Sequence, residues 1–170
     1  MTDSMRAKGS DQEVAERLQE FVYGTITAMV ALGALDAKNL GSARAATGVV
    51  IGTAIATWLA HAFAALVGVN VREHRAADRH EIVATFRQTW RIVTAAVPAT
   101  AMLLIADLEW ISLRTALAAA TLLGILQLVV VALIAARRSR FTIVGGIAYV
   151  VAATAIGLVI VVIEIAVVHH

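Results

Sequence analysis

The chain has 170 residues, of which 60% are hydrophobic and 15% are charged. Soluble domains carry about 25% charged residues, and here the apolar residues come in long uncharged blocks, which is the pattern of lipid-facing helices. The absence of cysteine excludes disulfides, thiolate metal sites and cysteine nucleophiles. The composition therefore predicts an all-α, polytopic transmembrane bundle, in which residues 14–170 form a single transmembrane domain.

The apolar blocks predict five membrane-spanning helices after a polar tail. Residues 1–13 are polar and of mixed charge, and we expect them to form a disordered cytoplasmic tail. An apolar stretch of about 20 residues is long enough to cross a bilayer. By this measure the spans fall at about 21–40, 45–71, 92–108, 111–136 and 141–168. Ser42 stands just before the second span, where a hydroxyl side chain can cap the start of a helix.

The stretch between the second and third spans carries much of the charge. Residues 72–91 include five arginines, and four apolar side chains fall on one helical face, namely Ile82, Val83, Phe86 and Trp90. This pattern predicts an amphipathic interfacial helix between the second and third spans. The third span contains the single proline of the chain, Pro98, which predicts a kink.

The basic residues predict the orientation of the chain. Of the 14 lysines and arginines, eleven fall before the first span (Arg6, Lys8 and Arg17), in residues 72–91 and in the basic turn after the fourth span. Since positive residues stay on the cytoplasmic side, we expect the N-terminus in the cytoplasm and the C-terminus outside, in a bacterial plasma membrane. The arginines flank apolar blocks, so they predict contact with anionic lipid and not with nucleic acid.

The second span carries a stripe of small residues. Every fourth position is glycine or alanine, at Gly48, Gly52, Ala56, Ala60, Ala64 and Gly68. Positions four apart share one face of a helix, and small side chains let membrane helices approach closely. We therefore expect this face to pack against other helices and the second span to be central in the bundle.

His61 lies near the middle of the same span, close to Trp58. A titratable side chain at bilayer depth is a functional candidate, and imidazole titrates near neutral pH. His61 would relay protons, gate on pH or coordinate an ion. The alternative is a neutral imidazole that hydrogen-bonds to a threonine or a carbonyl of the next helix. His61 and Trp58 are thus candidates for transport or gating.

Two acids near the outer ends of the spans are further transport candidates. Glu164 lies in the outer third of the fifth span and Asp36 at the outer end of the first, so both would contribute to a vestibule for cations. The alternative is structural. Glu164 would then pair with Arg114, which lies at a similar depth on the fourth span, and Asp36 would be a solvated loop acid.

Motifs for catalysis or metal binding are weak or absent in the sequence. His74, Asp78 and Glu81 fall at helical spacings, so one face would present a histidine and two carboxylates, which are ligands for a divalent metal. The interleaved arginines are expected to pair with the same acids, which leaves metal binding open. The sequence contains no phosphate-binding loop, nucleophile elbow or zinc-protease motif. We expect neither an enzyme nor a cofactor.

Two stretches resemble known membrane proteins. Val22-Tyr23-Gly24-Thr25 and Trp58-Leu59-Ala60-His61-Ala62-Phe63 together resemble a group of small actinobacterial integral membrane proteins that carries no assigned activity. Phe21 and Gly24 also resemble the opening of the pore-lining first helix in the bacterial and lysosomal Phe-Ser-Asp-motif potassium channels, with Val22-Tyr23 in place of the Ser-Asp pair. The second resemblance implies a tetramer around the first helix.

Two functions follow from these features. The first is an oligomeric channel or transporter for a cation or proton. The second is a non-transporting accessory or scaffold subunit that packs its small-residue stripes against partner membrane helices. A hydrated cavity around His61 would favour the first, and a dry helix seam the second. The expected partners are the lipid bilayer and either further copies of the chain or another membrane protein.

Overall fold

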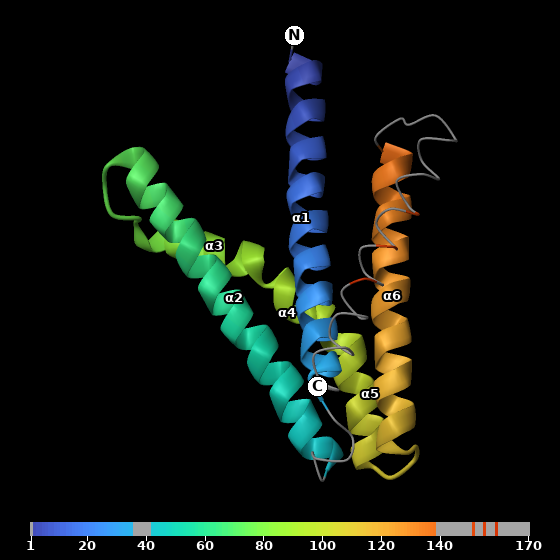
Figure 1. The fold of residues 1–170 in the computed structure, drawn as a ribbon. Helices are drawn as coiled ribbons and strands as arrows, with labels where there is room; N and C mark the ends of the chain where they lie inside the picture. Colours follow the sequence, from blue (N-terminus) through green and yellow to red (C-terminus); the bar gives the residue numbers. More distant parts are fainter. Residues whose placement is uncertain (1, 36–41, 139–150, 152–154, 156–158, 160–170) are drawn as a thin grey trace.

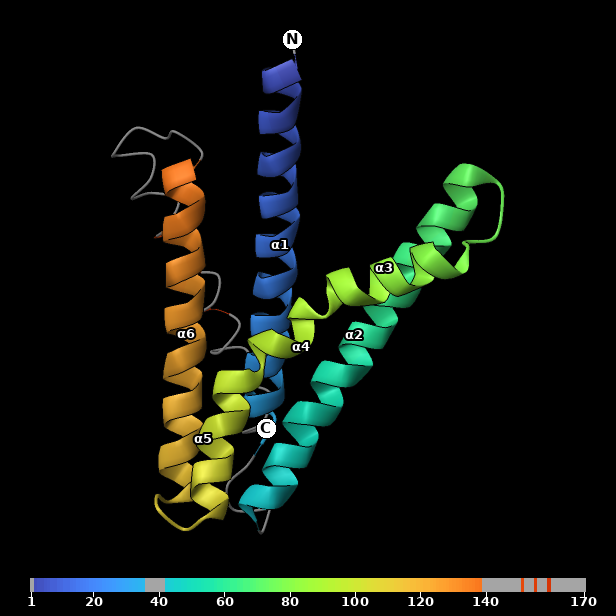
Figure 2. The same ribbon diagram turned by 180° about the vertical axis from the view of Figure 1, so that it is seen from behind.

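A computed structural model of the chain describes residues 2–35 and 42–138, together with residues 151, 155 and 159 (Figure 1). Within these residues the fold is all-α, as predicted, with six helices and no strand. α1 lies between α2 and α6 in both views and packs against α2, α4 and α6 (Figures 1 and 2). The central helix is therefore α1, which corrects the expectation that the second span has this place.

α1 (Thr2–Gly33) includes residues that we expected to be a disordered tail. Residues 2–13 contain no proline, and adding a residue to an existing helix costs far less than starting a new one. The apolar part of α1, Phe21–Gly33, rises only about 20 Å as a helix. This length is short of the ~30 Å hydrocarbon core of a bilayer.

α2 (Ala43–Glu73) begins at the predicted cap. The Ser42 hydroxyl accepts a hydrogen bond from the Ala45 N–H at 3.2 Å, which confirms its capping role. The helix ends at His74, whose φ of 51° lies in the left-handed region. That conformation ends the helix and turns the chain back.

α3 (Arg79–Thr89) is the amphipathic helix, but it is shorter than the predicted stretch 72–91. Its first turn is closed by a capping box, in which the side chains of Asp78 and Glu81 each accept the other residue's backbone N–H at 2.8 Å. The first residues of the predicted helix belong to α2 instead, because His74 and the capping box separate the two helices.

α4 (Arg91–Ala95) and α5 (Val97–Asp107) continue the chain after α3. The axis bends by 47° between residues 79–95 and α5, and Pro98 lies in the first turn of α5. Proline has no N–H to donate to the preceding turn, so the predicted kink is confirmed.

α6 (Leu113–Arg138) packs along α5 and α1. Its own small residues, Ala116 and Ala120, are almost completely buried. Most of the buried core is alanine, with Val50 and Leu103 among its larger members. Small side chains at these contacts allow the helix backbones to lie close together.

Two described helices, α2 and α6, are long and apolar enough to cross a membrane, or three if residues 79–107 form one bent span. Only 17% of the most apolar part of α2 is buried inside the bundle, which leaves apolar surface for lipid. The prediction of five spans is corrected accordingly. The charges at Glu16, Arg17 and Glu20 leave α1 with too short an apolar segment, and almost all of the predicted fifth span, 141–168, lies outside the described residues.

At Gly24, α1 lies very close to the backbone of α4. A Cβ atom at this position would lie 2.5 Å from the Ile92 carbonyl oxygen and 2.8 Å from the Ile92 Cα on α4. Both are backbone atoms, which cannot move aside as the end of a side chain can. The absence of a side chain at Gly24 therefore sets the distance between α1 and α4.

Replacing Gly24 with alanine is expected to lower the melting temperature. The added methyl group must push α1 away from α4, and overpacking of this kind costs about 1–3 kcal/mol. Alanine recovers at most about 1 kcal/mol through its helix propensity. Thermal denaturation of the purified protein in detergent, followed by circular dichroism, measures the effect. Ala118→Leu, which adds bulk at an exposed position of α6, is the control; equal melting temperatures for the two variants would contradict the close contact.

Candidate functional site

His61 lies where α2 faces α1. Its side chain is half-buried, and its ring centroid is 5.6 Å from that of Tyr23, with the ring planes inclined at 36°. Among the described residues His61 makes no hydrogen bond or ion pair. Neither of the two cavities described below includes this residue. The ring contact with Tyr23 places His61 between α2 and α1.

Trp58 belongs to an aromatic cluster that joins α2 to α3. Its indole N–H donates to the Phe86 carbonyl at 3.2 Å. Its ring meets those of Phe86 and Trp90 edge to face, with centroid distances of 5.4 and 4.9 Å, and each such pair stabilises by about 0.5–1.5 kcal/mol. The cluster also lines an open apolar groove of ≈ 420 Å³ along α3, together with Ile82, Val83 and Arg87.

The acidic candidates are not brought together within the described residues. Asp36 and Glu164 lie outside them, so the vestibule and the Glu164–Arg114 ion pair stay predictions. Arg114 itself is exposed near the start of α6. An ion pair in this fold instead joins Asp107, at the end of α5, to Arg44, at the start of α2, at 3.5 Å.

The small-residue stripe of α2 faces outward. Five of its six positions are exposed, and Gly68 is half-buried. A Cβ atom at Gly48, Gly52 or Gly68 would meet no atom within 4 Å. Within the described residues, the stripe therefore does not make the contacts expected of it; its members are Gly48, Gly52, Ala56, Ala60, Ala64 and Gly68.

A second row of residues on α2 makes the inward contacts. Ala46, Val50, Ala54 and Ala62 are buried, and Trp58 stands in the same four-residue series. This inward row is offset from the outward stripe by two positions, which is about 200° around a helix. The two rows therefore lie on opposite sides of α2. The inward row also contains the larger Val50 and Trp58, so the bundle buries the row of mixed size and leaves the row of small residues exposed.

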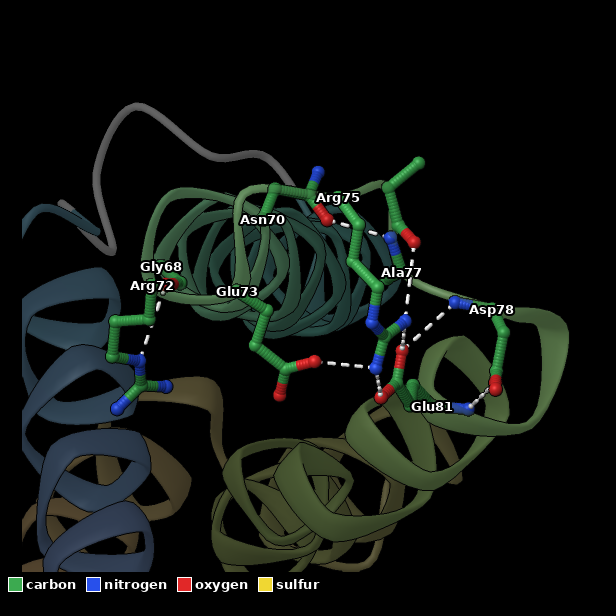
Figure 3. Close-up of polar contacts among 9 residues, drawn as sticks. Gly68, Asn70, Arg72, Glu73, Arg75, Ala77, Asp78 and Glu81 are labelled. Carbon is green, nitrogen blue, oxygen red and sulfur yellow. Dashed lines mark hydrogen bonds and ion pairs between the residues drawn. The ribbon is translucent and has the colours of Figure 1, made fainter.

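The connection between α2 and α3 is held by ion pairs (Figure 3). The guanidinium of Arg75 donates to both carboxylate oxygens of Glu81, at 2.6 and 2.9 Å, and also pairs with Glu73. The Asn70 side chain accepts the Ala77 N–H at 2.7 Å. No group of three metal-ligating side chains is present in the described part of the chain. Of the two acids suggested for a metal, Glu81 pairs with Arg75, as the alternative interpretation expected, whereas Asp78 caps the start of α3.

Glu20 is a buried acid that sequence reasoning missed. Only 8% of the residue is exposed, and its Oε2 atom has no hydrogen-bond partner among the described residues. Burial raises the pKa of this carboxyl, while nearby Arg91 opposes the shift and Glu16 adds to it. Glu20 is one helical turn before Gly24, on the face of α1 that packs against α4. The four-residue spacing between Glu20 and Gly24 was the sequence signal that could have identified Glu20 as a buried acid.

A polar cavity lies beside Glu20, between α1 and α3. It has a volume of ≈ 750 Å³ and is lined by residues of both helices and the start of α4. Three of the lining residues are arginines, Arg17, Arg87 and Arg91, and one is an acid, Glu16. The Gln88 side chain donates to the Glu16 carboxylate at 3.2 Å. The sequence alone did not bring these arginines together, because they come from segments about 70 residues apart.

The chain matches no protein-family model, no curated protein sequence and no solved structure. Its function therefore has to be inferred from its own residues and contacts. Two surface features stand out in the described residues, namely the outward stripe of α2 and the pair of cavities on the two sides of α3.

Replacing Glu81 with glutamine is expected to destabilise the protein in a pH-dependent way. Hydrogen bonds from Arg75 hold the pKa of Glu81 at about 2, below its ordinary value of 4.5. Because the folded-state pKa is lowered, the ion pair stabilises the fold above about pH 4.5 and loses this effect as the pH falls toward 2. Glutamine keeps the capping box and removes the charge.

The measurement is the melting temperature of wild type and Glu81→Gln from neutral to acidic pH. The variant should melt lower at pH 7, and the gap should shrink steadily below about pH 4.5. Glu109→Gln, which removes an exposed acid after α5, is the control and should show no such gap. A gap for Glu81→Gln that does not change with pH would refute the ion-pair contribution.

Proposed function

We propose that the protein is a small multi-pass membrane protein that acts as a non-transporting assembly subunit. In this proposal the outward stripe of α2 binds another membrane helix. The observation that carries it is the open space over Gly48, Gly52 and Gly68, where a Cβ atom would meet no atom of the described residues within 4 Å. In contrast, a Cβ at Gly24 or Gly124 would lie under 3 Å from the neighbouring helix.

This contrast supports a role for the stripe in contacts between chains. Where a glycine lies between two described helices, as at Gly24 and Gly124, atoms of the neighbouring helix occupy the space that a side chain would fill. On the outward face of α2 the same residue types repeat over five turns with no described partner. Small residues at regular spacing let two helices in lipid come close enough for dispersion contacts along their length. A second copy of the chain is the simplest partner, since a two-fold axis brings the same stripe together on both sides.

The arrangement of the helices supports a cytoplasmic N-terminus. The N-terminal end of α1 and the C-terminal ends of α2 and α6 point to one end of the bundle, and the α5–α6 connection lies at the other (Figure 1). The end that contains the N-terminus of α1 carries most of the basic residues of the chain. By the positive-inside rule, we place this end in the cytoplasm, with the bundle in a bacterial plasma membrane.

Ion conduction is the second candidate function. The contact that favours it is the ring pair of Tyr23 and His61 between α1 and α2, because a titratable imidazole between apolar helices is costly to retain without a role. The resemblance of Phe21 and Gly24 to a pore-lining helix also supports this candidate. Conduction requires several copies around α1, so it too depends on assembly.

Replacing Gly52 with leucine is expected to break the assembly. A leucine side chain on the stripe separates the paired helices, and losing 1–2 kcal/mol of helix contact weakens association about tenfold. Light scattering of the purified protein in detergent, with cross-linking in membranes, measures the oligomeric state. Ala118→Leu is the control, because it adds a similar bulk to an exposed position of α6. An oligomer unaffected by Gly52→Leu would rule out the stripe as the interface.

Replacing His61 with alanine tests conduction. If the seam of α1 and α2 conducts, cation or proton flux in liposomes should be lost in this variant, since the imidazole is a polar group of that seam. His80→Ala, which changes a histidine on α3, should leave the flux unchanged. Wild-type protein that is folded but gives no flux above empty liposomes would eliminate conduction and leave the assembly function.

A further inference from the structure

α3 separates two cavities of opposite character. On the side of α1 lies the polar cavity of ≈ 750 Å³ with Arg17, Arg87 and Arg91. On the side of α2 lies the apolar groove of ≈ 420 Å³ with the aromatic cluster. Val83 and Arg87 line both of them. The two cavities therefore meet along one edge of α3, and a single ligand could occupy both.

The polar cavity carries an excess of positive charge. Its three arginines face one acid, Glu16, which already accepts a hydrogen bond from Gln88. Arg87 is exposed and makes no ion pair among the described residues. The buried Glu20 near Arg91 has a raised pKa, which reduces its ability to neutralise that arginine. A guanidinium binds a phosphate group through two parallel hydrogen bonds.

The apolar groove is suited to a hydrocarbon chain. Ile82, Val83 and Trp90 expose 38%, 58% and 45% of their surface, next to the half-buried Trp58. These side chains still expose much of their apolar surface to solvent. An acyl chain that covers them therefore removes this surface from water. The groove begins at Arg87, where the polar cavity ends.

We propose that the two cavities form a binding site for one anionic phospholipid. The headgroup phosphate binds Arg87 and Arg91, and an acyl chain lies in the groove against Val83 and Trp90. A soluble anion would use the arginines but leave the groove empty, whereas a neutral lipid would use the groove but leave Arg87 without an ion pair among the described residues. An anionic lipid fits both the arginines of the polar cavity and the apolar groove. This site is independent of the α2 stripe proposed for assembly.

The test is native mass spectrometry of the full-length protein in detergent with added phosphatidylglycerol or phosphatidylcholine of the same acyl chains. Wild type should bind phosphatidylglycerol in preference to phosphatidylcholine. Arg87→Gln should weaken phosphatidylglycerol binding about tenfold, the lower end for a hydrogen bond between charged groups. Arg137→Gln removes an exposed arginine of α6 and should have no effect. The same spectra report the number of chains, so loss of lipid is distinguished from loss of assembly.

Two further measurements separate the sources of phosphate and guard against misfolding. Arg87→Lys keeps the charge but loses the two parallel hydrogen bonds, so it should bind more lipid than Arg87→Gln and less than wild type, whereas an unfolded variant would bind none. Inorganic phosphate at millimolar concentration should not displace the lipid. Equal weakening by Arg87→Gln and Arg137→Gln would overturn the site in favour of a general charge effect. Full displacement by inorganic phosphate would overturn the lipid assignment in favour of a simple anion site.

Discussion

The fold depends on how closely α1 can approach its neighbours. At Gly24 the backbone of α4 comes so near that a Cβ atom would lie 2.5 Å from a carbonyl oxygen. On α6, a Cβ at Gly124 would lie 2.7 Å from the side chain of Met29 on α1. Because α1 has close contacts with both helices, neither can move outward alone without leaving a gap. Small residues therefore hold this bundle together where a soluble protein would use large ones.

The two rows of residues on α2 differ in what they contact. α2 packs against α1 and α5, and its inward row of Ala46, Val50 and Ala54 is almost completely buried. This contact buries only one side of α2. The outward stripe lies about 200° away and is exposed in the described residues. Stability of the described bundle does not account for glycine at those positions, whereas a contact with another helix does.

Local features were predictable from the sequence and the choice of faces was not. The Ser42 cap, the kink at Pro98 and the apolar runs of α2 and α6 depend on a few neighbouring residues. The end of α2 at His74 depends on a left-handed residue that a periodic pattern does not reveal. Burial of Glu20 depends on Gly24 drawing α1 against α4, which is a contact between distant segments. Periodicity defines a face, but only packing decides where the face points.

The two proposed binding surfaces lie on opposite sides of α2. Trp58 stands in the inward row, and through its contacts with Phe86 and Trp90 it holds α3 on that side. The groove along α3 is therefore turned away from the outward stripe. A second chain on the stripe would not cover the groove or Arg87, so each copy in an assembly would keep its own lipid. Since Trp58 contacts the groove and belongs to the same helix as the stripe, lipid that orders this cluster would also stiffen the helix through which the copies associate.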